Sequence, residues 1–340
     1  MAYSFHPLFL EHDLPDHPET SSRLSTILAE WDRQGLPARL LAVPADPAPE
    51  PVLERIHDRR YLAWLQQESR DPPRYIEQDT YICAASYEAA TRSAGASIAC
   101  LQAVLEGKAR AAVALVRPPG HHARRASPMG FCLINNIACA AAWALAEGGL
   151  HRVLIFDFDV HHGNGTQDAF YDDPRLLYFS LHQRPLFPGT GSVEERGRGA
   201  GFGYNFNVPL RPGVGDASCL AVVEHLLRPA AERFAPEVIL VSAGYDGHWR
   251  EKLANLRLTV AGYTQLAREL TRLADDLCSG RLLFVLEGGY DGEVLAACTA
   301  NLAHVLLGEP HLCRDPIGEP PEAPRDDLAY IRSLSAVFGL

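Results

Sequence analysis

Short apolar runs alternate along this 340-residue chain with longer segments whose apolar residues recur at helical spacing. The apolar runs, bounded by turn residues, predict buried strands, and the amphipathic stretches predict helices. Such alternation is typical of a parallel sheet with helices on both faces. The predicted strands cover residues 111–116, 152–158, 176–181, 203–208, 237–243 and 281–286, and the predicted helices cover residues 20–34, 85–106, 132–147, 217–233, 260–278 and 292–307.

The chain shows no internal repeat and no low-complexity linker that would divide it. Two Pro-rich stretches, at residues 44–51 and 316–324, are short, and we interpret them as surface connections. With 47% hydrophobic and 21% charged residues, a chain of this length can bury a large core. We therefore predict a single α/β domain over residues 1–340.

Two of the predicted strands are followed by residues that suit a metal ion. Asp159 and His161 follow the apolar run at residues 153–156 and, being two residues apart, point to the same side of an extended chain. Asp246 follows the strand at 237–243. Because ligands bind at the carboxyl ends of parallel strands, these residues could supply three ligands and leave a position open for water. A hydrogen-bonded Asp/His cluster without metal is the alternative.

Two further strand ends carry groups suited to proton transfer. His121 and His122 follow the strand at 111–116 on a Pro/Gly turn, and Tyr290 follows the strand at 281–286 after two glycines. One imidazole near a metal can act as general base while the other is an electrostatic partner, and a tyrosine hydroxyl can stabilise an oxyanion. Solvated histidines and a core tyrosine are the alternatives. Together, the four strand ends indicate metal-assisted hydrolysis of an acyl bond.

These motifs resemble those of the zinc-dependent histone deacetylases and their bacterial relatives, including acetylpolyamine amidohydrolases. They stand in family order from about residue 12 to 300, and the opening His17-Pro18-Glu19 with Arg23-Leu24 is also similar. The resemblance implies the arginase/deacetylase architecture, with a central, mostly parallel eight-stranded sheet and helices on both faces. The motifs are RPPGHHA (117–123), GFCLINNIA (130–138), DFDVHHGNGT (157–166), FPGTG (187–191), SAGYDGH (242–248) and EGGYD (287–291).

The resemblance also implies a role for particular residues in catalysis. Some members of the family have Asp at the position of Asn164; because Asn is neutral, it should leave its histidine partner His122 less cationic. Asp159, His161 and Asp246 match the ligands of Zn²⁺, for which Fe²⁺ is the alternative metal. His121 and His122 match the catalytic histidine pair, and Asp157 and Asn164 match the partners of these histidines. Tyr290 matches the tyrosine that stabilises the transition state.

Further residues match the substrate tunnel and structural potassium sites of the family. Phe131 and Phe187 match the aromatic walls around the acyl-lysine stem, and Gly130, Gly289 and Leu253 match positions that line the tunnel or its rim. Asp157, Asp159, His161, Ser180 and Leu181 match the ligands of one K⁺ ion, and Phe170, Asp173, Leu176 and Tyr204 match the carbonyl ligands of a second.

The segment after Asp246 bears on the choice of substrate. Acetylpolyamine-selective relatives place an acidic residue about seven positions past this aspartate, where the chain has Leu253. We therefore predict removal of acetyl or other acyl groups from lysine side chains of proteins or peptides, with hydrolysis of small acetylated amines as the alternative. A small loop shift could still bring the carboxylate of Glu251 to the rim, and Trp249 could narrow the mouth, contact a partner chain or face solvent.

Two other classes of protein, binuclear ureohydrolases and inactive binding scaffolds, agree less well with these residues. A binuclear ureohydrolase would need an Asp-x-Asp pair, and the strand ending before Asp246 supplies one Asp only. An inactive binding scaffold would lack a ligand, a histidine or the tyrosine, and none is missing.

The charge and the cysteine content indicate which binding partners and which cellular compartment to expect. A formal net charge of −11 without a basic run argues against direct nucleic-acid binding. Eight cysteines without CxxC spacing favour a reducing compartment. No apolar run is long enough to cross a membrane, and the start Met1–Tyr3 lacks the basic residues of a signal peptide. We expect a cytoplasmic protein without a membrane partner, and leave homo-oligomerisation open.

Overall fold

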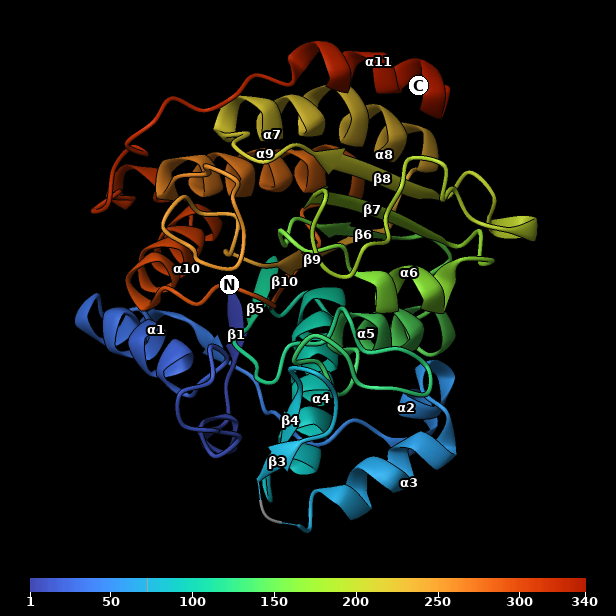
Figure 1. Cartoon of the computed structure of the whole chain (residues 1–340), viewed down its shortest axis with the longest axis vertical. Helices are drawn as coiled ribbons and strands as arrows, with labels where there is room; N and C mark the ends of the chain where they lie inside the picture. The colour runs from blue at the N-terminus through green and yellow to red at the C-terminus, as the bar shows by residue number, and fades with distance from the viewer. Residues whose placement is uncertain (72) are drawn as a thin grey trace.

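The computed structural model describes residues 1–71 and 73–340, which form an α/β domain around a parallel sheet (Figure 1). All strand pairs within the eight-stranded sheet are parallel. In spatial order the strands are β2 (Leu41–Ala42), β1 (Ala2–Ser4), β5 (Ala111–Ala114), β10 (Leu282–Leu286), β9 (Val238–Ala243), β6 (Val153–Asp157), β7 (Leu176–Gln183) and β8 (Asn205–Leu210).

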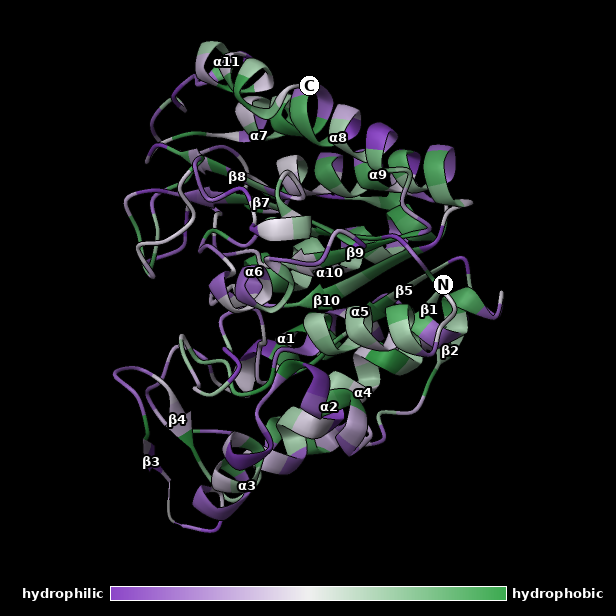
Figure 2. Cartoon of the chain, turned by 90° about the vertical axis from the view of Figure 1, so that its right-hand side faces the viewer, coloured by the Kyte–Doolittle hydropathy of each residue, from purple (hydrophilic) through white to green (hydrophobic). Residues whose placement is uncertain are grey.

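The six strands predicted from apolar runs are confirmed, each within two residues of its predicted bounds. Every residue of β6 and of β9 is buried, as expected for strands covered by helices on both faces. Figure 2 shows these central strands as mainly hydrophobic. The prediction missed β1 and β2, because segments of three and two residues are too short to show a strand pattern.

Helices cover both faces of the sheet. On one face, α4 (Ser86–Leu105) packs against α5 (Asn136–Ala146), and on the other, α10 (Gly292–Leu306) packs between α1 (Ser22–Arg33) and α9 (Val260–Cys278) (Figures 1 and 2). All five were predicted. α5 begins four residues later than predicted, because the side chain of Asn135 accepts a hydrogen bond from the amide of Ala138 and caps the helix there.

The predicted helix at 217–233 is not one regular α-helix. The segment consists of α7 (Asp216–Val222), a π-helical turn at Val223–Leu227 and α8 (Arg228–Phe234). The wider turn stands directly before Pro229, which has no N–H to donate and whose ring crowds the preceding turn. The helical pattern was therefore correct, but the proline changes the local hydrogen bonding.

Four further helices were not predicted. The helix α2 starts at Glu50, inside the Pro-rich stretch interpreted as a connection, with a proline in its first turn. The helix at Asn164–Phe170 has only seven residues, too few to stand out from its surroundings. These helices are α2 (Glu50–Ile56), α3 (Arg59–Glu68), α6 (Asn164–Phe170) and α11 (Leu328–Phe338). Among the described residues, no helix combines the length and apolar character needed to cross a membrane.

The strands that precede the predicted site residues all end at one edge of the sheet. The strands β5, β10, β9 and β6 are consecutive neighbours, and because they are parallel their carboxyl ends meet. A small antiparallel pair, β3 (Arg74–Tyr75) and β4 (Tyr81–Ile82), lies near this edge (Figure 2).

Candidate active site

Residues from three of the four strand ends line one pocket of about 190 Å³. His161 comes from the end of β6, His121 and His122 from the end of β5, and Tyr290 from the end of β10. The sheet order thus brings together side chains that are up to 169 positions apart in the chain.

The three predicted metal ligands meet at the floor of this pocket. The Nδ1 atom of His161 lies 3.0 Å from a carboxylate oxygen of Asp246 and 3.2 Å from one of Asp159. Both carboxylates are fully buried. The amide of Gly288 donates to Asp159 at 2.8 Å, and the amide of Val160 donates to Asp246 at 3.0 Å. These bonds fix the carboxylates so that their remaining oxygens converge with the imidazole.

Glycine is needed where the strand ends approach these carboxylates. A Cβ atom at Gly244 would overlap with the carboxylate of Asp159, and one at Gly288 would overlap with those of Asp159 and Asp246. The glycines of the SAGYD and EGGYD motifs therefore allow the β9 and β10 ends to close around the cluster.

The electrostatics of the cluster suit a divalent cation. Burial, and then the charge of Asp159, raise the pKa of Asp246, whereas His121 and His161 outweigh burial and lower the pKa of Asp159. Two carboxylates and one imidazole, all within 4.8 Å, form an O,N,O donor set of the kind that catalytic zinc sites use, with room for a further ligand. The residues therefore fit a zinc-type ion.

The adjacent histidines have different partners and opposite charge preferences. The Nδ1 of His121 lies 3.1 Å from a carboxylate oxygen of Asp157, and the Nδ1 of His122 lies 2.8 Å from the side-chain oxygen of Asn164. Burial disfavours the charge of His121, but Asp159 and Asp157 outweigh it and raise its pKa to about 10. Burial, and then the positive charges of His121 and His161, hold the pKa of His122 well below 6.5.

Two residues that support this pair were not found from the sequence. The hydroxyl of Tyr178 donates to the carboxylate of Asp157 at 3.0 Å. The buried carboxylate of Glu287 accepts hydrogen bonds from the amides of Gly120 and His121, at 2.7 and 3.1 Å. Glu287 begins the EGGYD motif, so the motif pointed to it without indicating its function; for Tyr178, in a strand without a motif, the sequence offers no such signal.

The turn that carries Tyr290 is held from several sides. Gly289 has φ = +113°, a conformation that favours glycine. The Nε of Arg23 donates to the carbonyl of Gly289 at 2.6 Å, and its guanidinium carbon lies 5.1 Å from the centroid of the Tyr290 ring. Arg23 therefore fixes both the backbone and the ring of this turn.

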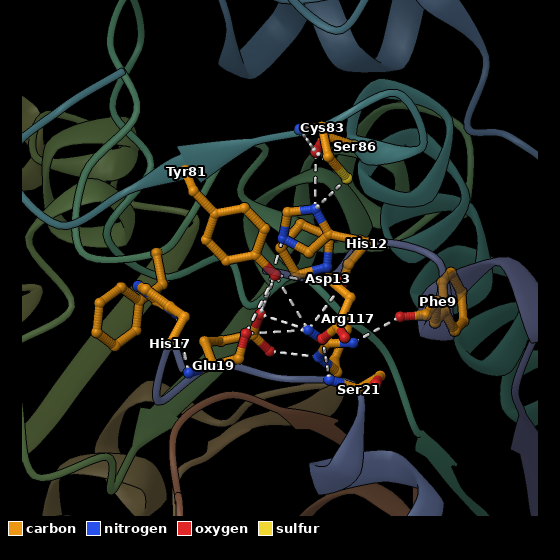
Figure 3. Close-up of polar contacts among 12 residues, drawn as sticks. Phe9, His12, Asp13, His17, Glu19, Ser21, Tyr81, Cys83, Ser86 and Arg117 are labelled. Carbon is orange, nitrogen blue, oxygen red and sulfur yellow. Dashed lines mark hydrogen bonds and ion pairs between the residues drawn. The ribbon is translucent and has the colours of Figure 1, made fainter. Parts of the chain in front are cut away.

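Arg23 also belongs to a buried ion network, and Figure 3 shows the part of it around Glu19 and Arg117. The carboxylate of Glu19 accepts hydrogen bonds from Arg117 at 2.5 and 2.8 Å, and Arg23 donates to it at 2.8 Å. Arg117 also donates to the backbone carbonyls of Phe9 and His12, at 2.7 and 2.8 Å. Burial raises the pKa of Glu19, but Arg117 outweighs it and lowers the pKa to about 2. The network ties the RPPGHH motif to the N-terminal segment.

Aromatic side chains form the walls of the pocket. The rings of Phe187 and His122 are 5.1 Å apart, and those of Phe131 and Tyr290 are 5.7 Å apart. A Cβ atom at Gly130 would crowd the rings of His122 and Phe187, so only glycine fits between the wall and the histidine. Both phenylalanines line the pocket.

At the mouth of the pocket, the structure differs from the sequence interpretation in the position of Glu251 and in the presence of Asp79. Leu253, which is 38% exposed, lines the pocket at its mouth, and Asp79, which was not predicted from the sequence, lines the pocket as well. Glu251 does not reach the rim, because its side chain is buried and accepts hydrogen bonds from the backbone. The indole of Trp249 donates to the carbonyl of Gly318 at 3.0 Å and is half-buried against the C-terminal segment.

The residues matched to potassium sites lie in two groups. Asp157 and Ser180 are register partners across β6 and β7, and Leu181 follows in the same strand. In the second group, the Phe170 carbonyl accepts from the amide of Asp173, and the Asp173 carbonyl accepts from the amide of Leu176. The carbonyl of Tyr204 accepts from the amide of Tyr178 at 3.0 Å.

Comparison with known proteins gives a consistent result. The sequence profile of the histone deacetylase domain matches residues 17–306. A probable deacetylase of Archaeoglobus fulgidus is 40% identical over 293 residues, covering 85% of this chain and 81% of that protein. The human polyamine deacetylase HDAC10 is 36% identical over 330 residues, covering 94% of this chain and 48% of its own. The crystal structure of the HDA15 HD domain superposes with a TM-score of 0.87 at 37% identity, covering 91% of each chain.

Proposed function

Because this chain belongs to the histone deacetylase family and is therefore a hydrolase acting on acetylated amides, we propose that it removes acetyl groups from the side-chain amine of lysine in proteins or peptides. The observation that carries the proposal is the pocket itself. A narrow space with walls formed by Phe131 and Phe187 ends at the Asp159–His161–Asp246 cluster, and its mouth carries the apolar Leu253. Such walls suit the four methylene groups of a lysine stem.

Asp159, His161 and Asp246 would hold a divalent ion, typically zinc in this family. When bound, this ion supplies Lewis-acid polarisation of the acyl carbonyl. The two carboxylates balance its charge in a site that excludes bulk water.

His122 is the proton carrier in this proposal. Its Nδ1–H donates to Asn164, whose amide group donates in turn to the sulfur of Met129 at 3.3 Å, so the Nε2 lone pair is free. With a pKa held low, His122 is neutral and can accept the proton of the attacking water. When the carbon–nitrogen bond breaks, the same nitrogen returns a proton to the leaving amine.

His121 and Tyr290 would stabilise the charge that develops on the acyl group. The carboxylates of Asp159 and Asp157 favour the imidazolium form of His121, which would provide a fixed positive charge beside the reacting carbonyl. The hydroxyl of Tyr290, which lines the pocket, would donate a hydrogen bond to the tetrahedral oxyanion. Of the tunnel glycines, Gly130 packs beside the histidine, and Gly289 would shape the turn below the acyl group.

A second substrate class, small acetylated polyamines, is favoured by one observation. The carboxylate-bearing Asp79 lines the mouth and could attract the free ammonium groups of such amines. A relative bears the name polyamine deacetylase. We rank this class second, because Leu253, which lines the same pocket, carries no charge.

A direct comparison of substrates tests the proposal. We expect kcat/KM for an acetyl-lysine peptide to exceed that for acetylputrescine and acetylspermidine. A tenfold preference for acetylspermidine would reverse the order of the two classes, and no hydrolysis of either would contradict both.

We also propose that the two groups on β7 and its flanking loops bind structural K⁺. Asp157 and Ser180 are register partners in neighbouring strands, which supports the first site. Asp159 would contribute a backbone or side-chain oxygen, and His161 and Leu181 would contribute their backbone carbonyl oxygens. The grouped carbonyls of Phe170, Asp173, Leu176 and Tyr204 support the second. Exchange of K⁺ for Li⁺ should lower the Tm of the enzyme, and an unchanged Tm would argue against both sites.

A further inference from the structure

The side chain of Glu251 points inward beneath the turn that carries Tyr290. It is 8% exposed, and a single carboxylate oxygen accepts hydrogen bonds from the amides of Tyr290 and Asp291, at 2.7 and 2.9 Å. Leu253, two residues farther along, instead lines the mouth of the pocket. The segment after Asp246 therefore contributes both to the rim and to the support of the tyrosine.

A second contact from the same segment reaches the same turn. The guanidinium of Arg250 pairs with the carboxylates of Asp291 and Glu293, at 2.9 and 2.7 Å. Asp291 is also the N-cap of α10, since its side chain accepts from the amides of Glu293 and Val294. The consecutive residues Arg250 and Glu251 thus hold the charged side chains and the backbone of the Tyr290 turn, at the point where α10 begins.

The turn needs such external contacts because its own sequence restrains it weakly. Gly288 and Gly289 lack a Cβ and can adopt many backbone conformations. Asp159 holds the amide of Gly288, and Arg23 holds the carbonyl of Gly289. The same peptide group carries the amide of Tyr290, which is bound by Glu251, so Arg23 and Glu251 hold its two ends. Rotation of this peptide would swing the phenol hydroxyl away from the pocket.

Building on the proposed function, we propose that Glu251 is a positioning residue, which fixes the backbone at Tyr290 and thereby sets the location of the tyrosine hydroxyl relative to the acyl group. It does not touch the substrate; it acts through Tyr290. Glu251 binds two consecutive amides of this turn, and an error of about 1 Å in a catalytic group can cost on the order of 100-fold in rate.

Three substitutions test this role in the metal-loaded enzyme. Glu251→Leu removes the acceptor and should lower kcat by about 10-fold to 100-fold with less than about a 3-fold change in KM. Glu251→Gln keeps an oxygen at the same reach and should retain kcat within about 3-fold. Should Glu251→Leu fail to fold, Glu251→Asp, which is one methylene shorter, should give an intermediate loss of kcat.

A matched control separates this role from general stabilisation. A carboxylate oxygen of Glu237 likewise accepts hydrogen bonds from two consecutive amides, those of His151 and Arg152, at 2.6 and 2.8 Å. It lies at the opposite ends of the strands, outside the pocket. Glu237→Leu should lower Tm without changing kcat.

A double-mutant cycle decides whether Glu251 acts through the tyrosine. In a Tyr290→Phe background, Glu251→Leu should lower kcat by less than about 2-fold, because the hydroxyl it positions is already gone. A full additional loss in that background, or an unchanged kcat for the folded Glu251→Leu and Glu251→Asp variants, would overturn the positioning role alone. Full activity of Tyr290→Phe would instead overturn the proposed role of Tyr290, and the inference about Glu251 with it.

Discussion

His122 forms its hydrogen bond with a neutral partner, Asn164, at 2.8 Å, although the neighbouring His121 faces the carboxylate of Asp157. The two imidazoles are 4.0 Å apart between ring centroids and cannot both carry a proton without repulsion. The carboxylates of Asp159 and Asp157 favour the charge on His121, whereas burial and the charges of His121 and His161 lower the pKa of His122 and leave it as the base. The charges around the two rings, to which Asn164 adds none, therefore separate the tasks of the two histidines.

Replacement of this neutral partner should change the pH profile. In Asn164→Asp, a carboxylate next to His122 would raise its pKa, so the neutral form would be lost at a higher pH than in the unmodified enzyme. The acidic limb of kcat/KM should move to higher pH. Asn164→Ala, which removes the bond without adding charge, should lower kcat without that movement. An unshifted acidic limb in Asn164→Asp would show that His122 is not the base.

Removal of one carboxylate from the pocket floor should abolish metal binding. Asp246→Ala leaves only Asp159 and His161, and open catalytic sites tolerate the loss of a charged ligand poorly. Metal content per chain, measured by elemental analysis, should drop sharply, together with activity. The matched control is Asp168→Ala, which removes an exposed carboxylate paired with Arg124. Full metal occupancy in Asp246→Ala would contradict the ligand assignment.

Loss of the tyrosine hydroxyl should affect the chemical step. Tyr290→Phe is expected to lower kcat by about 10²-fold to 10³-fold, as for other oxyanion donors, while metal content and Tm stay unchanged. Tyr330→Phe, in α11, serves as the control. A fully active Phe variant would mean that the Tyr290 ring only packs beside the site.

The charge at the mouth should control substrate preference. Leu253→Glu would add a carboxylate to the pocket that Asp79 also lines, and kcat/KM for acetylspermidine should rise by about 10-fold. Leu312→Glu adds the same charge at an equally exposed leucine in a turn outside the pocket, 39% exposed against 38%, and should change nothing. An equal response of the two variants would show that net charge, rather than the mouth, attracts the amine.

The buried network in Figure 3 should make the fold sensitive to acid. Arg117 lowers the pKa of Glu19 from 4.5 to about 2, so its contribution to stability is complete above pH 4.5 and is lost as the pH falls toward 2. Burial lowers the pKa of His12 from 6.5 to about 3, so the folded state also loses stability as the pH falls from 6.5 toward 3. Free energies of unfolding measured between pH 7 and 3 should therefore decline with falling pH.

Glu19→Gln tests the origin of this decline. At pH 7 it should destabilise the fold by about 3–5 kcal/mol, because Arg117 and Arg23 lose the charge that compensates them. Below pH 4.5 its free energy of unfolding should fall less steeply than that of the unmodified enzyme. Parallel pH curves for both proteins would place the acid sensitivity elsewhere.

The sequence by itself determined which segments form the main strands and helices and which strand ends carry reactive groups. Both follow from local patterns: an apolar run with a turn beyond it predicts β6, and a spacing of two places Asp159 and His161 on one side. The motifs also pointed to Tyr290 and to the histidine pair. Local patterns failed where the run was too short, as in β1, or where Pro229 altered a helix.

Only the tertiary structure decided which groups meet. The sheet order places β10 between β5 and β9, and Arg23 reaches the carbonyl of Gly289 across 266 positions of the chain. In irregular loops no repeating pattern sets the direction of a side chain, so the sequence could not show that Glu251 turns inward while Leu253 lines the mouth. Long-range packing and the need to pair buried polar groups decide these positions.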